Sequence, residues 1–285
     1  MINLLKGLEA TPPIVRRTVK REDAIALARV TKDRNAVHHD PEVAARLNLR
    51  DVLVIGTYLS TAGSQIPHYI LNLLRGKNPL YNFLDQEVTW EGKTFPGDEI
   101  SWRCEDNPGI VYDRTTGIVT VNTIAEVENA TRARIVTRLS VQRPIVEPVE
   151  DKRLVYEEEI EINQNDTREY KRITGESEFF TAAIIPGSLV AYTEKLNQSQ
   201  GTNYIALNAG MTSRFVEPLR MTGDTETLEI KVYENPARHR IKNRTAAYGF
   251  RTIASQQGRI VVDTEIQGFI KGHFDNLYAL RPDTK

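Results

Sequence analysis

Long runs that alternate between apolar and polar residues occur in pairs, once in each half of the chain. The first half contains GIVTVNTIAEV (117–127) and ARIVTRLSVQR (133–143), and the second half contains RTAAYGFRTIAS (244–255) and RIVVDTEIQGFI (259–270). Thr, Val and Ile dominate these runs, and such alternation is typical of strands with one face in water. The pattern therefore predicts a pair of antiparallel strands in each half.

Upstream of each strand pair, the apolar residues change to helical spacing. In the segment that begins at Gly56 the apolar positions are Leu59, Ala62, Ile66, Tyr69, Ile70 and Leu73. Pro67 is expected to end or kink this helix. In the second half, the spacing of Leu189, Tyr192 and Leu196 predicts a helix that Pro186-Gly187 opens.

Further features repeat around these helices. The segment REDAIALARVT (21–31) resembles QNDTREYKRIT (164–174), so that Asp23 corresponds to Asp166 and Thr31 to Thr174. After each helix a Gly-Asp pair, at 97–98 and at 223–224, leads into an alternating segment. This arrangement is typical of a strand, a turn and a second strand.

Each half thus reads as a strand, a short helix, a loop, a longer helix and several antiparallel strands, which is the hotdog architecture. We predict an α+β double hotdog, with two antiparallel sheets that each wrap a central helix and join edge to edge as a pseudo-dimer. The N-terminal hotdog spans residues 1–143, a proline-containing linker spans 144–154, and the C-terminal hotdog spans 155–285.

The two halves differ in one connection. Asp33 precedes Gly56 by 23 residues, whereas the corresponding Glu176 precedes Gly187 by 11. The second half therefore lacks about a dozen residues, and it has no counterpart of the polar motif in the segment TKDRNAVHHD (31–40). We expect this shortened connection to open a tunnel for an acyl chain.

Composition restricts the classes of function. The chain has 285 residues and a formal net charge of −1, so it carries no basic field for nucleic acid or for an acidic membrane surface. The single cysteine, Cys104, cannot form an internal disulfide and is expected to be a buried strand thiol. The apolar part of the N-terminal segment MINLLKGLEATPP (1–13) is too short, and the segment too polar, for a signal peptide. No apolar run of the sequence is long enough to span a bilayer. We therefore expect a cytoplasmic protein.

The segment TKDRNAVHHD (31–40) concentrates polar residues and two of the five histidines. It can be read as a solvated loop, as a metal site or as a general acid–base pair. A metal site formed by His38, His39 and Asp40 is disfavoured, because adjacent histidines point in different directions and no third His or Cys lies at ligand spacing. We expect no metal.

The acid–base alternative involves Asp33 and His38. Addition of water across a conjugated double bond needs a base that activates the water and an acid that protonates the α carbon. An aspartate and a neutral histidine can hold one water molecule between them. A backbone N–H at the start of the helix at Gly56 can stabilise charge on a thioester oxygen.

These residues carry a family resemblance. DRNAVHHDPEVAARL (33–47) resembles the D-x-N-P-x-H-x-D-P loop of the MaoC-like, (R)-specific enoyl-CoA hydratases, also called hydratase 2. The family's helix glycine corresponds to Gly56, its helix serine to Ser64, and KTFPGDEI (93–100) is similar to its later Gly-Asp turn. The resemblance covers most of residues 15–143, with a weaker hotdog-like similarity over 155–272.

The resemblance implies roles for the matching positions. Asp33 and His38 are implied to be the catalytic pair, Asn35 to shape the loop, and Gly56 to bind the thioester oxygen through its N–H. Ser64 is implied to support His38 or its loop. Asp40 is expected to cap the helix PEVAARL, since Asp-Pro-Glu is a helix-start signature.

The implied reaction is reversible hydration of a trans-2-enoyl thioester to the (R)-3-hydroxyacyl thioester, in fatty acid or polyketide-type metabolism. No cofactor is implied, since coenzyme A (CoA) or the phosphopantetheine of an acyl carrier protein is the substrate carrier. The expected partners are such thioesters, with no nucleic acid and no membrane, and double hotdogs can pair further as a homodimer.

Two departures from the family pattern leave alternatives open. Ala36 stands where the family has proline, and Ile55 stands where it has His or Pro. The chain can therefore also be a non-catalytic or heterodimerising hotdog that binds thioesters, or a hotdog thioesterase. The Asp-Asn-His loop fits hydration better than thioester hydrolysis.

The other residues with reactive side chains are expected to be structural. His39 is expected to be solvated, and the remaining histidines, His68, His239 and His273, have no acidic partner at a telling spacing. Trp90 and Trp102 are expected on a sheet face. The basic segment 234–244 is either a solvated hairpin or a contact for a carrier phosphate.

Overall fold

The computed structural model describes residues 12–46, 48–106, 108–149, 152–200, 205–234, 240–242 and 245–271. The elements of the first half are β1 (Val15–Thr18), α1 (Arg21–Val30), η2 (Ala36–His38), α2 (Pro41–Arg46), α3 (Gly56–Gly63), α4 (Gln65–Arg75), β2 (Asn82–Trp90), β3 (Glu99–Cys104), β4 (Ile110–Tyr112), β5 (Val119–Val127) and β6 (Ala130–Ser140). Those of the second half are β7 (Leu154–Asn163), α5 (Gln164–Thr174), α6 (Phe180–Gln200), β8 (Ile205–Phe215), β9 (Thr225–Glu234), β10 (Arg240–Lys242), β11 (Thr245–Gln256) and β12 (Arg259–Lys271).

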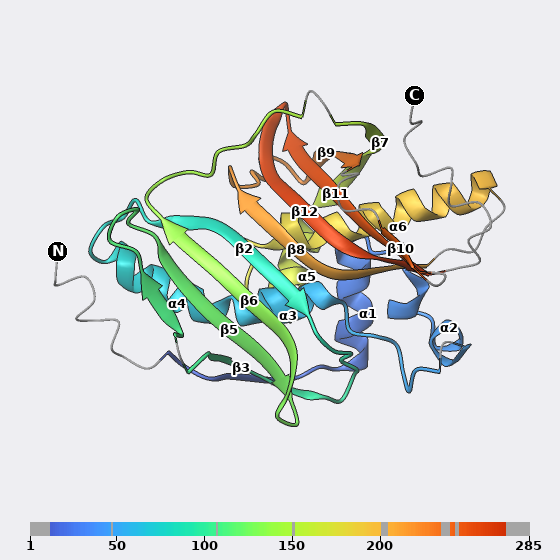
Figure 1. The fold of residues 1–285 in the computed structure, drawn as a ribbon, viewed down its shortest axis with the longest axis horizontal. Coiled ribbons are helices and arrows are strands. Elements are labelled where there is room, and N and C mark those ends of the chain that lie inside the picture. Colours follow the sequence, from blue (N-terminus) through green and yellow to red (C-terminus); the bar gives the residue numbers. More distant parts are fainter. Residues whose placement is uncertain are drawn as a thin grey trace.

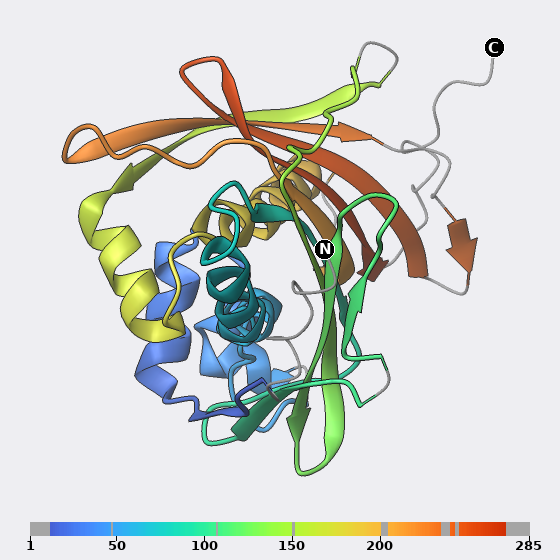
Figure 2. The same cartoon turned by 90° about the vertical axis from the view of Figure 1, so that its left-hand side faces the viewer.

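The strands form one continuous antiparallel sheet that curves around the helices (Figures 1 and 2). The strand order is β1-β3-β5-β6-β2-β8-β12-β11-β9-β7, so the second half repeats the order of the first in reverse. The α+β class and the hotdog architecture are confirmed. The expected edge-to-edge joining is present, but it makes one continuous sheet rather than two, because β2 and β8 hydrogen-bond to each other and leave neither half with a free edge at the junction.

A pseudo-twofold axis passes through the β2–β8 pair, where Glu87 lies opposite Thr212. Each half has one β-bulge next to this axis, and the two bulges show which residues of the halves correspond. The β2–β6 pairing skips the residue after Phe83, and the β8–β12 pairing skips the residue after Asn208. Phe83 and Asn208 each precede the axis pair by four residues, so the two halves superimpose in register through these strands.

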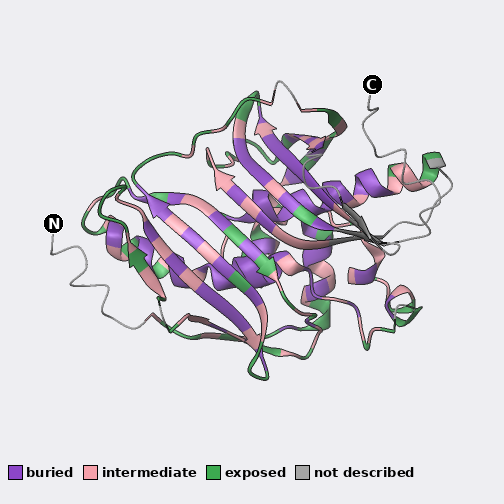
Figure 3. Ribbon diagram, in the orientation of Figure 1, coloured by how far each residue is buried: buried purple, intermediate pink, exposed green. Residues whose placement is uncertain are grey.

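The alternating runs of the sequence form the expected hairpins. In β5 the residues that face the helices are buried and most of those between them are partly exposed, a pattern that Figure 3 shows as stripes along the strands. The β5–β6 turn places Glu128 and Asn129 at φ of 51° and 62°, and the β11–β12 turn places Gln257 and Gly258 at 51° and 76°. Two consecutive residues with positive φ are typical of the type I′ turn, which matches the twist of the strands.

The Gly-Asp turns precede β3 and β9 as predicted, but neither closes a hairpin. β2 pairs with β6 and β8, whereas β3 pairs with β1 and β5. The strand–turn–strand interpretation is therefore wrong about pairing. The chain instead crosses the half-sheet after β2, so that β6 and β5 lie between β2 and β3.

The central helix of the first half is interrupted after eight residues. α3 ends at Gly63, and α4 begins at Gln65. Pro67 is the third residue of α4, where no intrahelical hydrogen bond to its nitrogen is needed. The expected proline effect is therefore a break that lies just before Pro67. Both helices pack against the sheet, and Ile66, Ile70 and Leu71 are fully buried.

The central helix of the second half begins earlier than predicted. α6 starts at Phe180 and contains Pro186 in its interior, so Pro186-Gly187 does not open it. Packing outweighs the loss of one helical hydrogen bond, because nearly every residue from Phe179 to Leu189 is buried. No helix of the described residues is long and apolar enough to cross a membrane.

The start of α6 changes how the two halves align. Gly63-Ser64 and Gly187-Ser188 each occupy the eighth and ninth positions counted from the first residues of α3 and α6. Gly187 is therefore the counterpart of Gly63, and Phe180 is the counterpart of Gly56. The connection from Glu176 to the helix is four residues, against 23 from Asp33, so the second half lacks 19 residues rather than a dozen.

The connection between the halves is held against the second half of the sheet. Arg251 and Asp263 form a buried ion pair, with Nε and Oδ1 2.8 Å apart. Arg251 Nη2 also donates to the carbonyl oxygen of Glu147 at 2.7 Å. A buried guanidinium must have acceptors for its N–H groups. Asp263 supplies two carboxylate oxygens, and the carbonyl of Glu147 in the linker supplies another acceptor.

Candidate active site

The loop that carries the candidate residues starts directly after α1. Lys32 adopts a left-handed conformation with φ of 56°, and Asp33 N–H donates to the carbonyl oxygen of Ala28 at 2.9 Å. This tight turn ends the helix and directs Asp33 away from the α1 axis. The Asp33 side chain is only 8% exposed.

Asn35 shapes the loop, as predicted. Asp33 Oδ1 accepts a hydrogen bond from Asn35 N–H at 2.9 Å, and Asn35 Oδ1 accepts one from Val37 N–H at 3.3 Å. These two short-range turns lead into the 3-10 turn η2, which starts at Ala36. The polar side chains thus supply the restraint that a proline at position 36 would otherwise give.

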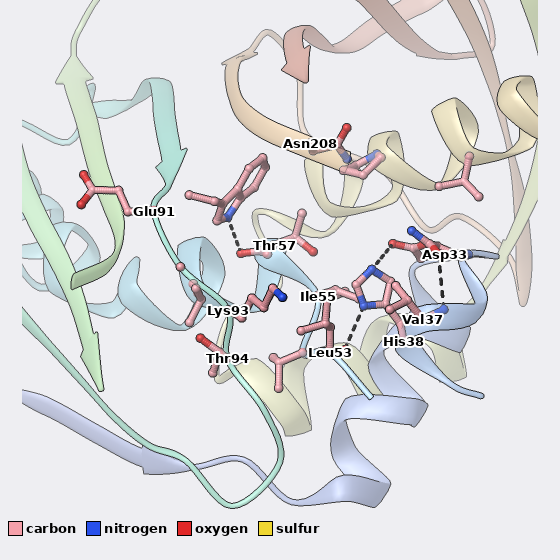
Figure 4. A pocket seen from close by; sticks show the side chains of 18 residues that line it. Asp33, Val37, His38, Leu53, Ile55, Thr57, Glu91, Lys93, Thr94 and Asn208 are labelled. Atoms are coloured by element: carbon pink, nitrogen blue, oxygen red, sulfur yellow. Dashed lines mark hydrogen bonds and ion pairs between the residues drawn. The ribbon is translucent and has the colours of Figure 1, made fainter. Parts of the chain in front are cut away.

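His38 ends this turn and faces Asp33. Its Nδ1 lies 2.8 Å from the carbonyl oxygen of Leu53. Because a carbonyl can only accept, Nδ1 carries the proton and Nε2 of the neutral ring has a free lone pair. Nε2 lies 3.7 Å from Asp33 Oδ2, and the two side chains point toward each other in Figure 4. This separation exceeds a direct hydrogen bond and allows one water molecule to contact both groups.

The start of α3 forms the opposite wall. Ile55 is extended, with ψ of 140°, and Gly56 begins the helix. Within the described residues, Gly56 N–H has no protein acceptor, and Gly56 lines the pocket, so a free donor and the positive end of the α3 dipole are at this wall.

Trp90 fixes this helix start. Its Nε1 donates to the carbonyl oxygen of Gly56 at 2.9 Å. A Cβ atom on Gly56 would lie 2.6 Å from the Trp90 indole, so only glycine fits beneath the ring. The sequence predicts Trp90 only as a sheet-face residue, and its place as the last residue of β2 gives no separate signal of a role at the site.

These groups line one cavity of about 310 Å³. The first half contributes the Asp33–His38 loop, residues 53–57 and residues 90–94, and the second half contributes Pro186, Val190 and Asn208. The exposed Lys93 directs its amino group towards the pocket (Figure 4). The cavity is therefore built at the junction of the two halves, although the polar loop comes from one of them.

The second half also supports the loop from behind. A Cβ atom on Gly187 would lie 2.6 Å from the carbonyl oxygen of Lys32 and 3.3 Å from Asp33 Cα. Two ion pairs flank the same segment, with Lys32 Nζ 2.8 Å from Asp166 Oδ2 and Arg34 Nη2 3.7 Å from Glu158 Oε2. The sequence pattern gave no indication that α6 touches Asp33.

The remaining predicted residues lie in different places. Asp40 caps α2, as expected, since its Oδ1 accepts hydrogen bonds from the N–H groups of Glu42 and Val43 at 2.8 and 3.3 Å. His39 is exposed. Ser64 is fully buried between α3 and α4, and its hydroxyl donates to the carbonyl oxygen of Thr61. The structure therefore does not place Ser64 beside His38.

The corresponding region of the second half is differently equipped. Glu176 is the counterpart of Asp33, and its Oε2 lies 3.4 Å from Nδ1 of His68, which comes from α4 of the first half. The sequence offers His68 no acidic partner at a telling spacing, and the partner that the fold brings to it is distant in the chain. Phe180 N–H donates to the carbonyl oxygen of Ser177 at 3.2 Å, so the helix-start donor that is free at Gly56 is occupied here.

The shortened connection does not extend the first cavity. Ser177, Glu178 and Phe179 line a separate cavity that shares no lining residue with the one at Asp33. The space left by the missing residues is therefore not a continuation of the site at Asp33.

Other candidate chemistry lies outside the site. Cys104 is partly buried at the end of β3, and burial raises the pKa of its thiol to about 11, which disfavours the thiolate. His239 and His273 lie outside the described residues, as does most of the basic segment 234–244. The described residues contain no group of three His, Cys, Asp or Glu side chains placed to hold a metal ion.

The fold is similar to solved structures at low sequence identity. Rv0216 from Mycobacterium tuberculosis, described as having a double hotdog fold, is 10% identical with a TM-score of 0.60, and the match covers 92% of this chain and 96% of that one. A MaoC domain protein dehydratase from Chloroflexus aurantiacus is 10% identical, with a TM-score of 0.59 and coverage of 91% and 95%. A MaoC-like dehydratase is 13% identical, with a TM-score of 0.57 and coverage of 93% and 99%.

No protein-family profile and no curated protein sequence matches the chain. The similarity to the solved structures, in contrast, covers about nine-tenths of the chain. It confirms the predicted resemblance to MaoC-like enzymes at the level of the fold.

Proposed function

Starting from this shared fold, we propose that the protein catalyses the reversible hydration of a trans-2-enoyl thioester to the (R)-3-hydroxyacyl thioester. One observation carries the proposal. The free Nε2 of His38 and the carboxylate of Asp33 stand 3.7 Å apart at a pocket whose other wall presents the free N–H of Gly56. A water between the first two groups and a thioester oxygen at the third would place the reacting atoms together.

In this proposal the water donates one hydrogen bond to His38 Nε2 and the other to Asp33 Oδ2. As its oxygen adds to the β carbon, a proton passes to Nε2, and the resulting imidazolium is stabilised by the adjacent carboxylate. The Leu53 carbonyl holds Nδ1–H throughout, which keeps the ring in the tautomer that can accept a proton. The proton is then delivered to the α carbon, so the product is neutral and the site is restored.

The thioester oxygen gains enolate charge while the β carbon is attacked. The Gly56 N–H stabilises that charge, and the dipole of α3 adds to the effect. Trp90 keeps this donor in place because its indole lies against Gly56 and hydrogen-bonds the carbonyl of the same residue. The arrangement supports hydration and dehydration equally, since both pass through the same enolate.

The substrate lies across the junction of the halves. The apolar side chains of Val190 and Pro186 give the acyl group a wall supplied by α6. The amino group of Lys93 provides a cation for a phosphate of the carrier, CoA or phosphopantetheine. Replacing Lys93 by Gln is expected to raise KM for the CoA thioester and leave kcat nearly unchanged.

The proposal is tested with crotonyl-CoA by following the loss of ultraviolet absorption of the conjugated thioester, together with chiral analysis of the product and an assay for free thiol. Formation of the (R)-3-hydroxy product without thiol release supports hydration. Thiol release at a comparable rate identifies a thioesterase. Absence of any reaction with enoyl-CoA and enoyl-carrier-protein substrates of several chain lengths leaves only a thioester-binding role and rejects the proposal.

A further inference from the structure

A second cavity, of about 620 Å³, lies across the pseudo-twofold axis from the candidate active site. It is formed by the start of α6, the first residues of β2, and the end of β8 with the residues that follow it. Phe215 is the counterpart of Trp90, because each lies three residues after the axis pair of Thr212 and Glu87. Trp90 lines the first cavity, and Phe215 lines the second. The second cavity therefore occupies the place that the first would have if the halves were identical.

Aromatic side chains replace the polar groups of the first site. Phe83 stands where the first cavity has Asn208, and Phe215 stands where it has Trp90. With Phe179 they form a closed set of edge-on contacts, since Phe179 lies 4.8 Å from Phe83 and 5.0 Å from Phe215 between ring centroids. Leu219 and Met221 extend the apolar lining. Such a surface favours a hydrocarbon or aromatic body.

Hydration chemistry is not retained here. Phe180 N–H is occupied by Ser177, so no helix-start donor is available for a thioester oxygen. The 19 residues that carry the polar loop in the first half are missing from the second. The ligand of this cavity is therefore bound without the acid–base groups of the active site.

Arginine side chains collect at the rim. Arg143, Arg220 and Arg259 surround the single carboxylate of Glu217, at N–O distances of 3.2, 3.6 and 3.9 Å. Arg75 also lines the cavity and bonds to the neutral acceptors of Tyr81 and Asn82. The lining itself contains Arg75 and Arg143 together with Glu178 and Glu217. Glu217 is paired with arginines, whereas Arg75 bonds, within the described residues, only to neutral acceptors, so an anionic head group is favoured beside Arg75.

We propose that this cavity binds an amphipathic monoanion, an apolar body with one carboxylate such as a medium-chain fatty acid. The apolar body packs on the Phe83, Phe179 and Phe215 rings, and the carboxylate lies at Arg75 and Arg143. Its volume is within the range of about 300–1,000 Å³ that is usual for small-molecule sites. This site is distinct from the catalytic pocket and does not depend on the proposed function.

The test uses the full chain and measures binding of decanoate by calorimetry and by displacement of anilinonaphthalene sulfonate. Leu219→Trp fills the cavity from a partly exposed position and is expected to weaken decanoate binding by about tenfold or more. Val111→Trp, at an exposed residue of β4 that lines neither cavity, is the matched control and should bind as the wild type does. The double variant Arg75→Gln, Arg143→Gln should weaken binding of decanoate more than binding of decanol.

Val190→Trp distinguishes the two cavities, because it fills the catalytic pocket instead. Decanoate binding that survives Val190→Trp and is lost in Leu219→Trp supports the proposal, and so does retained binding in Asp33→Asn. The reverse pattern places the ligand in the catalytic pocket and overturns it. Equal affinities in the wild type and Leu219→Trp, or no binding at all, also overturn it, whatever the result of the hydration assay.

Discussion

The two halves of this molecule share one sheet and one strand order, yet they differ at the start of the central helix. In the first half a loop of more than twenty residues brings Asp33 and His38 over a helix whose first N–H is free. In the second half four residues make the same connection, the first N–H is occupied, and phenylalanines fill the floor. The comparison shows that the same place in the fold can carry a polar loop with a free helix-start donor in one half and an aromatic floor in the other.

The second half nevertheless contributes to the first site. Gly187 in α6 packs against the Lys32 carbonyl, and the wall of the pocket includes Pro186 and Val190. A half that carries no catalytic pair can still hold the loop of its neighbour in place.

The largest effect is expected from the residues that only the first half possesses. Asp33→Asn and His38→Gln should each lower kcat for enoyl-thioester hydration by about 10²–10⁴-fold, because each removes a group that accepts or passes a proton. Steady-state kinetics measure the loss, and circular dichroism verifies the fold.

The matched controls lie on the other side of the axis. Glu176→Gln and His68→Gln alter the corresponding acid and its imidazole partner, which line no part of the catalytic pocket. Both should retain nearly the wild-type rate. If they reduce the rate as strongly as Asp33→Asn does, the assignment of chemistry to the first half is wrong.

The next effect concerns the helix start. Gly56→Ala places a methyl group within 2.6 Å of the Trp90 indole, so either the ring or the first turn of α3 must move. Displacement of the N–H donor is expected to lower kcat by about 10²–10³-fold. Replacing Trp90 by Ala in the same chain makes room, so the double variant should be faster than Gly56→Ala alone. A double variant no faster than the single one would contradict a role for this fit.

A smaller effect is expected from the support given by α6. Gly187→Ala pushes on the Lys32 carbonyl and shifts Asp33, which should lower kcat by about 10–100-fold while KM stays nearly constant. Ser188→Ala is the matched control, because the buried Ser188 hydroxyl has no hydrogen-bond partner within the described residues. Equal kinetics in both variants would show that the loop holds Asp33 without help from the second half.

Much of this arrangement can be predicted from the sequence. The alternating strands, the repeated order of elements and the cluster of Asp33, Asn35 and His38 depend on local spacing, and the structure places these three residues around one pocket. The start of α6 was mispredicted because Pro186-Gly187 is a local helix-start signal, whereas burial of the preceding residues extends the helix. The contacts of Trp90, His68 and Gly187 could not be predicted, since each joins segments that are distant in the chain.

The smallest effect concerns stability rather than rate, and it depends on Glu176. Burial raises the pKa of this carboxyl, and the nearby His68 only partly opposes the shift. A folded-state pKa above the unfolded value means that the contribution to stability is present below the ordinary glutamate pKa. That contribution is lost as the pH rises through the raised value. The wild type therefore carries a cost at neutral and alkaline pH that a neutral side chain avoids.

Glu176→Gln should accordingly be more stable than the wild type at pH 8 and nearly equal to it at pH 4, as measured by urea unfolding. Glu178→Gln is the control, because that carboxylate is 43% exposed and lies farther from His68, so it should change the unfolding midpoint little at either pH. A Glu176→Gln variant that is less stable at pH 8 would mean that the ion pair with His68 outweighs burial. Glu176, the counterpart of Asp33, would then stabilise the fold through His68, whereas Asp33 faces His38 at the pocket of the first half.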